Sequence, residues 1–298
     1  MLATLVALAL PLAAAPAVAG AATLALDPPR ARPGDAVLVI IRGAAPRPTA
    51  SLAGQALSFF PVAGGHAALA GLPVETPPGP LPIEVSLGEG GGAGEVRGTL
   101  RVEPPAFPHR SLEVQQRYVE PPAPEVERRI AEDRAAFARA FSQPPSPPLF
   151  RGRLAWPLRA RVTAGYGEQR TFNAVRASQH YGLDLAGKVG APVGAAQAGR
   201  VVLVRDGWAS GKSVVVWHGA GLYTTYFHLS RIRVQEGQVV RRGERLGDVG
   251  ATGRASGPHL HWGVRVGDLY VDPRSVLRLA FEFRDATPRS RAPRPARP

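Results

Sequence analysis

The chain has 298 residues, which is enough for two modest domains, and its hydrophobic fraction of 45% supports a sizeable core. It contains no cysteine, so disulfides, thiolate metal sites and cysteine nucleophiles are all excluded, and a transition-metal site would have to use His, Asp and Glu. The net charge of +13 suits a polyanionic neighbour, although an arginine-rich coding bias explains it equally well, and no nucleic-acid-binding motif accompanies it.

The chain begins with an apolar run that is typical of an export signal. Residues 1–22 end in small residues with an Ala-x-Ala pattern at Ala17–Ala19. Pro11 and Pro16 interrupt the run, which disfavours a stable spanning helix. No Lys or Arg precedes the apolar run. We expect a cleaved signal peptide, with a retained anchor as the alternative.

Residues 23–105 form short apolar segments separated by Gly and Pro. Segments of about five residues with regular turn signals predict a small β-sandwich-like domain. Its histidine, His66, follows two glycines and is expected to be a loop residue. No chemistry is visible in this region, so a spacer or targeting role is expected.

Residues 106–150 read as a Pro-rich linker that contains one helix. The helical pattern runs from about Pro124 to Phe141 between proline clusters, and His109 in the linker is expected to be inert. Apolar side chains recur at helical spacing, which predicts that the helix packs on a domain; they are Val126, Ile130, Phe137 and Phe141.

Residues 151–283 are rich in strand signals, and residues 284–298 form a basic Pro-rich tail that we expect to be disordered. β-Branched and aromatic stretches predict strands at 199–206, 213–218 and 222–228, with a hairpin turn between the last two. A lipoyl- or biotinyl-carrier domain has similar hairpins but needs a lysine at a hairpin tip. The relevant turn reads Val-Arg-Arg-Gly, which excludes that alternative.

Two short motifs in this region pair side chains that can bind a metal. His259 and His261 stand two apart, so a strand would turn both to one face. His180 and Asp184 stand four apart, and a straight strand would hold them too far apart for one ion. A bend at Gly182 would bring them together, since glycine tolerates the backbone angles of a kink. Each motif alone is a weak signal.

Taken together and in order, the blocks of this region resemble the catalytic domain of the LytM/lysostaphin-type zinc metallopeptidases, the M23 family of peptidoglycan endopeptidases. The matching blocks are HYGLDLAG, VVVWHGAGLYTTYFHLS, VQEGQVVRRGERLGDVGATGRASGPHLHW and the VDP at 271–273, over roughly residues 160–275. The resemblance implies a mainly β fold, with antiparallel sheets forming an active-site groove that has the metal on its floor.

The resemblance also implies one Zn²⁺ per chain. His180 and Asp184 match the first ligand pair of the family, His261 matches the third ligand, and a water would take the fourth position. His228 and His259 match the two catalytic histidines that handle protons, and the sequence leaves open which of them is the base.

Substrate-contacting residues are less well defined. Tyr226 would share a face with His228 in a regular strand, so it could donate a hydrogen bond to the substrate or oxyanion, or else be a packed strand tyrosine. Some family members have a tyrosine six residues before the first histidine, where this chain has Ala174. Asn173 is the alternative contact at that position.

These expectations combine into an exported zinc metalloendopeptidase that hydrolyses peptide bonds in peptidoglycan cross-links or bridges. It would act in the periplasm or cell envelope as a monomer, without nucleic acid, and its basic surface would suit an anionic envelope polymer. The alternative is a non-catalytic factor that binds peptidoglycan or activates an amidase. The sequence leaves open which bond is cleaved and whether residues 23–150 inhibit the enzyme.

Overall fold

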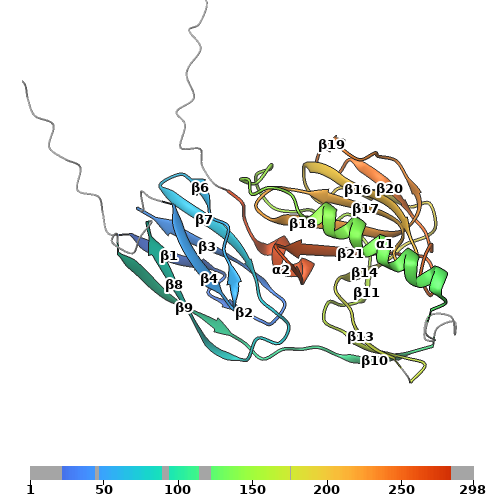
Figure 1. Cartoon of the computed structure of the whole chain (residues 1–298), viewed down its shortest axis with the longest axis horizontal. Helices are drawn as coiled ribbons and strands as arrows, with labels where there is room; N and C mark the ends of the chain where they lie inside the picture. The colour runs from blue at the N-terminus through green and yellow to red at the C-terminus, as the bar shows by residue number, and fades with distance from the viewer. Residues whose placement is uncertain (1–21, 44–46, 89–93, 114–121, 175, 283–298) are drawn as a thin grey trace, which may run out of the picture.

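The computed structural model describes residues 22–282 except 44–46, 89–93, 114–121 and 175. The expected signal peptide and basic tail therefore lie outside the described residues. Figure 1 shows two β-rich lobes side by side, the first built from the N-terminal strands and the second from the C-terminal strands, with a short helix between them. None of the described helices is both long and apolar enough to cross a membrane.

The first lobe is a sandwich of two sheets whose inner faces share one core. Turn residues separate short strands, and alternating apolar side chains such as Ile83 and Val85 point into the core. One sheet orders β1 (Thr23–Asp27), β3 (Ala36–Arg42), β7 (Gly65–Gly71) and β6 (Phe60–Val62). The other orders β2 (Arg30–Ala31), β9 (Glu95–Val102), β8 (Gly79–Leu87), β4 (Pro48–Leu52) and β5 (Gln55–Ala56).

Strand β3 is buried on both faces, which explains its continuous apolar sequence. Val37 and Val39 point into the sandwich core, whereas Ala36 and Leu38 belong to the core of the second lobe. The amide of Ala36 also donates to the Ser275 hydroxyl at 2.9 Å. The two lobes therefore share apolar packing and are not joined by the linker alone.

The second lobe is built on a large antiparallel sheet. Its β-branched and aromatic sequences form the strands that the pattern predicts, so the strand predictions at 199–206, 213–218 and 222–228 are confirmed. The main path orders β11 (Val162–Ala164), β14 (Leu183–Ala186), β21 (His259–Val266), β18 (Leu222–Ile232), β17 (Gly211–Trp217), β16 (Gly199–Gly207) and β19 (Val239–Val240). β15 (Pro192–Gly194) pairs with β20 (Arg245–Val249), which also pairs with β18, and β22 (Leu269–Val271) pairs with β21.

The linker contributes more structure than its sequence suggests. The predicted helix is confirmed as α1 (Pro124–Phe141), with a proline in its first turn. The segment around His109 is strand β10 (His109–Leu112), which pairs in parallel with β12 (Gln169–Phe172); β12 also pairs with β13 (Arg176–Gln179). Backbone hydrogen bonds therefore tie this part of the predicted linker to the second lobe. A second helix, α2 (Pro273–Arg278), is capped by Asp272, whose side chain accepts from Arg274 N.

Candidate metal centre

Three side chains from separate segments converge where β14 pairs with β21. The strand register places Asp184 opposite His261, and the bend before β14 brings His180 to the same point. His180 Nε2 lies 2.9 Å from Asp184 Oδ1 and 3.0 Å from His261 Nδ1, and the latter two atoms are 2.9 Å apart. The structure therefore brings together the three predicted metal ligands.

Gly182 is required at the bend for a different reason from the one we expected. Its φ is not positive, so the backbone there does not need the special freedom of glycine. Instead, a Cβ at this position would lie 2.7 Å from Cε1 and Nε2 of His261. Glycine is needed because the His261 ring occupies the space that a side chain would fill.

A further layer of contacts orients the first two ligands. His180 Nδ1 donates to the Gly165 carbonyl at 2.7 Å, which leaves the lone pair of Nε2 facing the other ligands. Arg170 donates to Asp184 Oδ2 at 2.9 Å and to Glu168 Oε1 at 2.8 Å. Nothing in the sequence singles out Arg170 and Glu168, since one arginine among many carries no signal of its own.

Electrostatics keep the Asp184 carboxylate ionised. Burial alone would raise its pKa, but the two imidazoles beside it, those of His180 and His261, outweigh burial and hold that pKa far below its usual range. Burial also lowers the pKa of His261, although Asp184 opposes this shift. A charged carboxylate beside imidazole lone pairs is an arrangement that a cation stabilises.

The donor set fits a catalytic metal. Two imidazole nitrogens and one carboxylate oxygen are ligands that Zn²⁺ accepts, and three protein ligands leave a position open for water or substrate. The His180 side chain is 4% exposed, and the side chains of Asp184 and His261 are 12% and 14% exposed. The cluster is thus shielded by protein but reachable from one side.

A second pair of histidines lies beside the cluster. The ring centroids of His228 and His259 are 4.8 Å apart, and His259 Nε2 lies 3.7 Å from Asp184 Oδ1. His228 Nδ1 donates to the Thr252 carbonyl and His259 Nδ1 donates to the Gly257 carbonyl, both at 2.8 Å. Each neutral ring therefore keeps Nε2 as an acceptor. Burial, together with His261 and His259, lowers the pKa of His228 to about 3.

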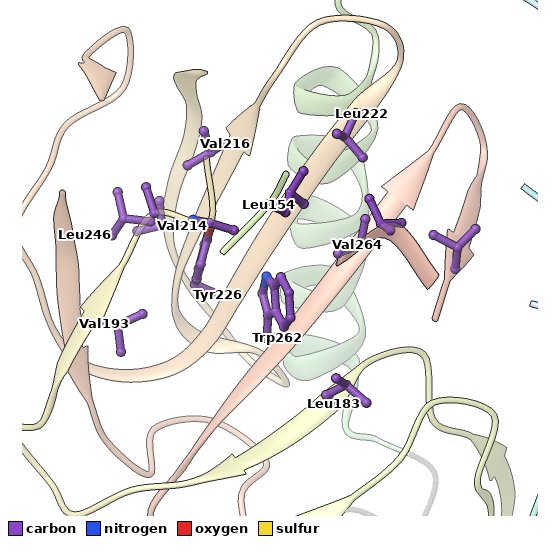
Figure 2. Close-up of a cluster of buried hydrophobic side chains, with 14 of the residues drawn as sticks. Leu154, Leu183, Val193, Val214, Val216, Leu222, Tyr226, Leu246, Trp262 and Val264 are labelled. Carbon is purple, nitrogen blue, oxygen red and sulfur yellow. The ribbon is translucent and has the colours of Figure 1, made fainter. Parts of the chain in front are cut away.

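Strand β18 is irregular where it carries His228, and this corrects the expectation for Tyr226. His228 has a φ of +62°, and the register of β18 against β17 shifts between Tyr226 and Leu229. The bulge breaks the alternation of side chains, so Tyr226 does not share a face with His228. Figure 2 shows Tyr226 among core side chains such as Val214 and Trp262.

The hydroxyl group of Tyr226 is fully engaged within this core. It accepts from Ala196 N at 2.8 Å and lies 2.9 Å from the Thr224 hydroxyl. Tyr226 has no exposed surface, so it is the packed tyrosine of the two alternatives and not a substrate contact. Phe227 lies opposite His261 in the regular register of β18 with β21, and its ring stacks on the His261 ring with centroids 5.4 Å apart.

Asn173 and Ala174 form the turn between β12 and β13. Both have positive φ values, +47° and +57°, and Asn173 N donates to the Leu112 carbonyl at 2.9 Å. Asparagine tolerates this conformation well. A substrate contact by Asn173 stays a prediction.

The remaining histidines have structural positions. His218 is fully buried, with Nδ1 donating to the Ala198 carbonyl and Nε2 2.8 Å from the Thr224 hydroxyl. His109 Nε2 lies 2.9 Å from the Thr171 hydroxyl. His66 lies in strand β7, so the loop expected there is wrong; the strand continues the pairing with β3 up to Gly65.

Comparison with known proteins gives the class of this fold and site. The model of the family described as Peptidase family M23 matches residues 178–273, which contain the four site histidines and Asp184. A solved structure from Pseudomonas aeruginosa that is named for the same family shares 32% identity, covers 82% of this chain and 94% of that one, and superposes with a TM-score of 0.61. The chain belongs to peptidase family M23.

Individual relatives match part of the chain. Peptidoglycan DD-endopeptidase ShyB of Vibrio cholerae is 36% identical over 143 residues, which are 47% of this chain and 32% of that protein. Peptidoglycan DD-endopeptidase ShyA of the same organism is 41% identical over 103 residues, which are 34% of this chain and 24% of that protein. The chain thus spans about a third or less of the length of these curated relatives.

Proposed function

We propose that this protein is a zinc metalloendopeptidase that hydrolyses peptide bonds in peptidoglycan cross-links. The observation that carries the proposal is the convergence of His180 Nε2, Asp184 Oδ1 and His261 Nδ1 within 3.0 Å of one another. Membership of family M23 and the DD-endopeptidase names of two relatives support the reaction and the substrate class.

The residues of the site divide the work between binding and proton transfer. A Zn²⁺ ion held by His180, Asp184 and His261 would polarise the scissile carbonyl and lower the pKa of a water. His228 and His259 present neutral Nε2 atoms beside this position, because each Nδ1 proton is committed to a backbone carbonyl. One of these histidines takes a proton from the attacking water, and the pair returns a proton to the leaving amine.

Access and charge fit a polymeric substrate. The His259 and His261 side chains are 15% and 14% exposed, and the neighbouring Tyr181 is 41% exposed, so a chain can approach from this side. The net charge of +13 suits an anionic envelope polymer. We infer export to the periplasm or cell envelope from the apolar N-terminal run and the substrate, and we expect a monomer.

The test combines metal analysis with product analysis. The purified full chain should bind one Zn²⁺ and release uncross-linked muropeptides from purified peptidoglycan, as measured by mass spectrometry. His261→Ala should abolish both results, because it removes one ligand. A wild-type protein that binds no zinc, or that leaves all cross-links intact while its fold is unchanged, would contradict the proposal and favour a non-catalytic envelope factor.

A further inference from the structure

Helix α1 lies on the same face of the large sheet as the metal centre. Side chains alternate along β21, so Trp262 points into the core while His261 points to the opposite face. Phe227 of β18 shares the face of His261, and Phe137 of α1 packs edge-on against Phe227 with ring centroids 5.6 Å apart. Figure 1 shows α1 lying across these strands. Phe227 is thus held between the helix on one side and the His261 ring on the other.

A second contact joins α1 to the turn between β16 and β17, residues 207–211. Asp133 is the buried polar residue of the helix, and its Oδ2 accepts from Trp208 N at 2.7 Å while Oδ1 pairs with Arg205. Arg129, one turn earlier, donates to the Asp206 carbonyl at 3.1 Å. A buried ion pair adds little net stability, because desolvation offsets its attraction. The pair does, however, hold the turn in one position.

That turn is bonded directly to the catalytic histidine strand and its neighbouring loop. The Ser210 carbonyl accepts from His228 N at 2.9 Å, and the Ala209 carbonyl accepts from Arg254 N at 2.8 Å. The same loop contains Thr252, whose carbonyl accepts from His228 Nδ1. A shift of the turn would therefore move both the backbone of His228 and the group that orients its ring.

We propose that Phe137 and Asp133 are positioning residues of the peptidase site. Phe137 acts through Phe227 on the metal ligand His261, and Asp133 acts through the turn at 207–211 on His228. Both residues lie in the linker, outside the range that matches the family model. The inference rests on the proposed function and deepens it, since it makes the linker helix part of the site rather than a spacer.

The phenylalanine contact is tested in the full chain with a matched control. Phe137→Ala should weaken Zn²⁺ binding, measured by competition with a chromophoric chelator, by about tenfold, the lower end of the effect of second-layer contacts. Phe141→Ala removes the same ring from the next turn, where it packs on Tyr223 and Arg265. The Phe141 ring also stacks on Phe137 with ring centroids 6.0 Å apart, but it reaches Phe227 only through Phe137. That control should lower the melting temperature and should weaken zinc binding clearly less than Phe137→Ala does.

The aspartate contact should give a different signature. Asp133→Ala should lower kcat on peptidoglycan about tenfold with little change in zinc affinity, because His228 is not a ligand. Asp133→Asn retains an oxygen that can accept from Trp208 N, so it should restore part of kcat. A purely structural role would change the melting temperature in both variants without this separation of kcat from zinc affinity.

The outcomes separate the two proposals. If the wild type binds zinc and cleaves but Phe137→Ala and Asp133→Ala match Phe141→Ala in zinc affinity and kcat, the positioning role is wrong. Raised turnover in Phe137→Ala would overturn it too, in favour of an inhibitory helix. Should Phe137→Ala not fold, Phe137→Leu keeps most of the volume and should still weaken zinc binding severalfold; unchanged affinity in that variant contradicts the inference. A wild type without zinc or cleavage refutes the proposed function instead.

Discussion

Two buried polar clusters on opposite faces of one sheet have opposite chemistry. On the core face, His218, Thr224 and Tyr226 form a chain that ends on the Ala198 carbonyl and the Ala196 amide, so its groups pair with one another. On the other face, His180, Asp184 and His261 direct acceptor atoms at a common point. In the first cluster every donor has an acceptor, so the hydrogen bonds are satisfied within the protein. In the second cluster acceptor atoms face one another, and a bound cation would stabilise them.

The largest effect should follow from breaking the acceptor cluster. His180→Ala removes one of three ligands, and we expect peptidoglycan cleavage to fall about a thousandfold, the loss of several kcal/mol of transition-state stabilisation. Bound zinc, measured by elemental analysis, should fall with it, while the melting temperature of the metal-free protein changes little. Retained zinc and cleavage in this variant would show that the cluster does not hold the metal.

The core-face cluster should affect stability and its pH dependence rather than cleavage. Burial lowers the pKa of His218 to about 4, against about 6.5 in an unfolded chain. Between these values the unfolded chain binds a proton that the folded chain refuses, so stability falls as the pH is lowered through this window, by roughly 3 kcal/mol at most. Chemical denaturation from pH 7 to pH 4 measures this loss.

His218→Gln provides the control for that pH dependence. The variant lacks the titrating ring, so its stability should depend less steeply on pH across the same window, while other groups contribute equally to both proteins. If the unfolding free energies of the wild type and the variant depend on pH in the same way, the pH dependence comes from groups other than His218.

Removing a support of the acceptor cluster should give an intermediate effect. Arg170→Ala deletes the hydrogen bond to Asp184 Oδ2, and we expect zinc affinity to fall between about tenfold and a hundredfold. Arg170→Lys keeps the charge but not the two-pronged geometry that also reaches Glu168, so it should recover only part of the affinity. Chelator competition measures both, and equal affinities in all three proteins would remove Arg170 from the site.

The smallest effect distinguishes the two faces most directly. Tyr226→Phe removes one hydroxyl from the core-face cluster and should cost about 1–2 kcal/mol of unfolding free energy, because Ala196 N loses its partner. Cleavage by the folded variant should be unchanged. A large fall in kcat without loss of stability would restore Tyr226 as a substrate contact.

Regular strands and helices, and the residues placed by their periodicity, could be predicted from the sequence. Residues placed by the bulge in β18 or by long-range strand pairing could not. The two-residue spacing of His259 and His261 on β21 could be read from strand periodicity, as could helix α1 from its proline boundaries and helical pattern. The position of Tyr226 could not, because the bulge at His228 places a residue other than glycine at positive φ, and no residue type announces that. Arg170 was also hidden, since its role depends on the pairing of β12 with β13 and not on its neighbours in the chain.

The burial of both faces of β3 has a practical consequence for fusing parts of this protein to other domains. A fusion that carries the second lobe alone would expose the apolar surface that Ala36 and Leu38 of β3 cover, and it should aggregate. A stable chimaera should therefore include the N-terminal sandwich. Scanning calorimetry of the intact chain should accordingly record one cooperative endotherm for both lobes instead of two.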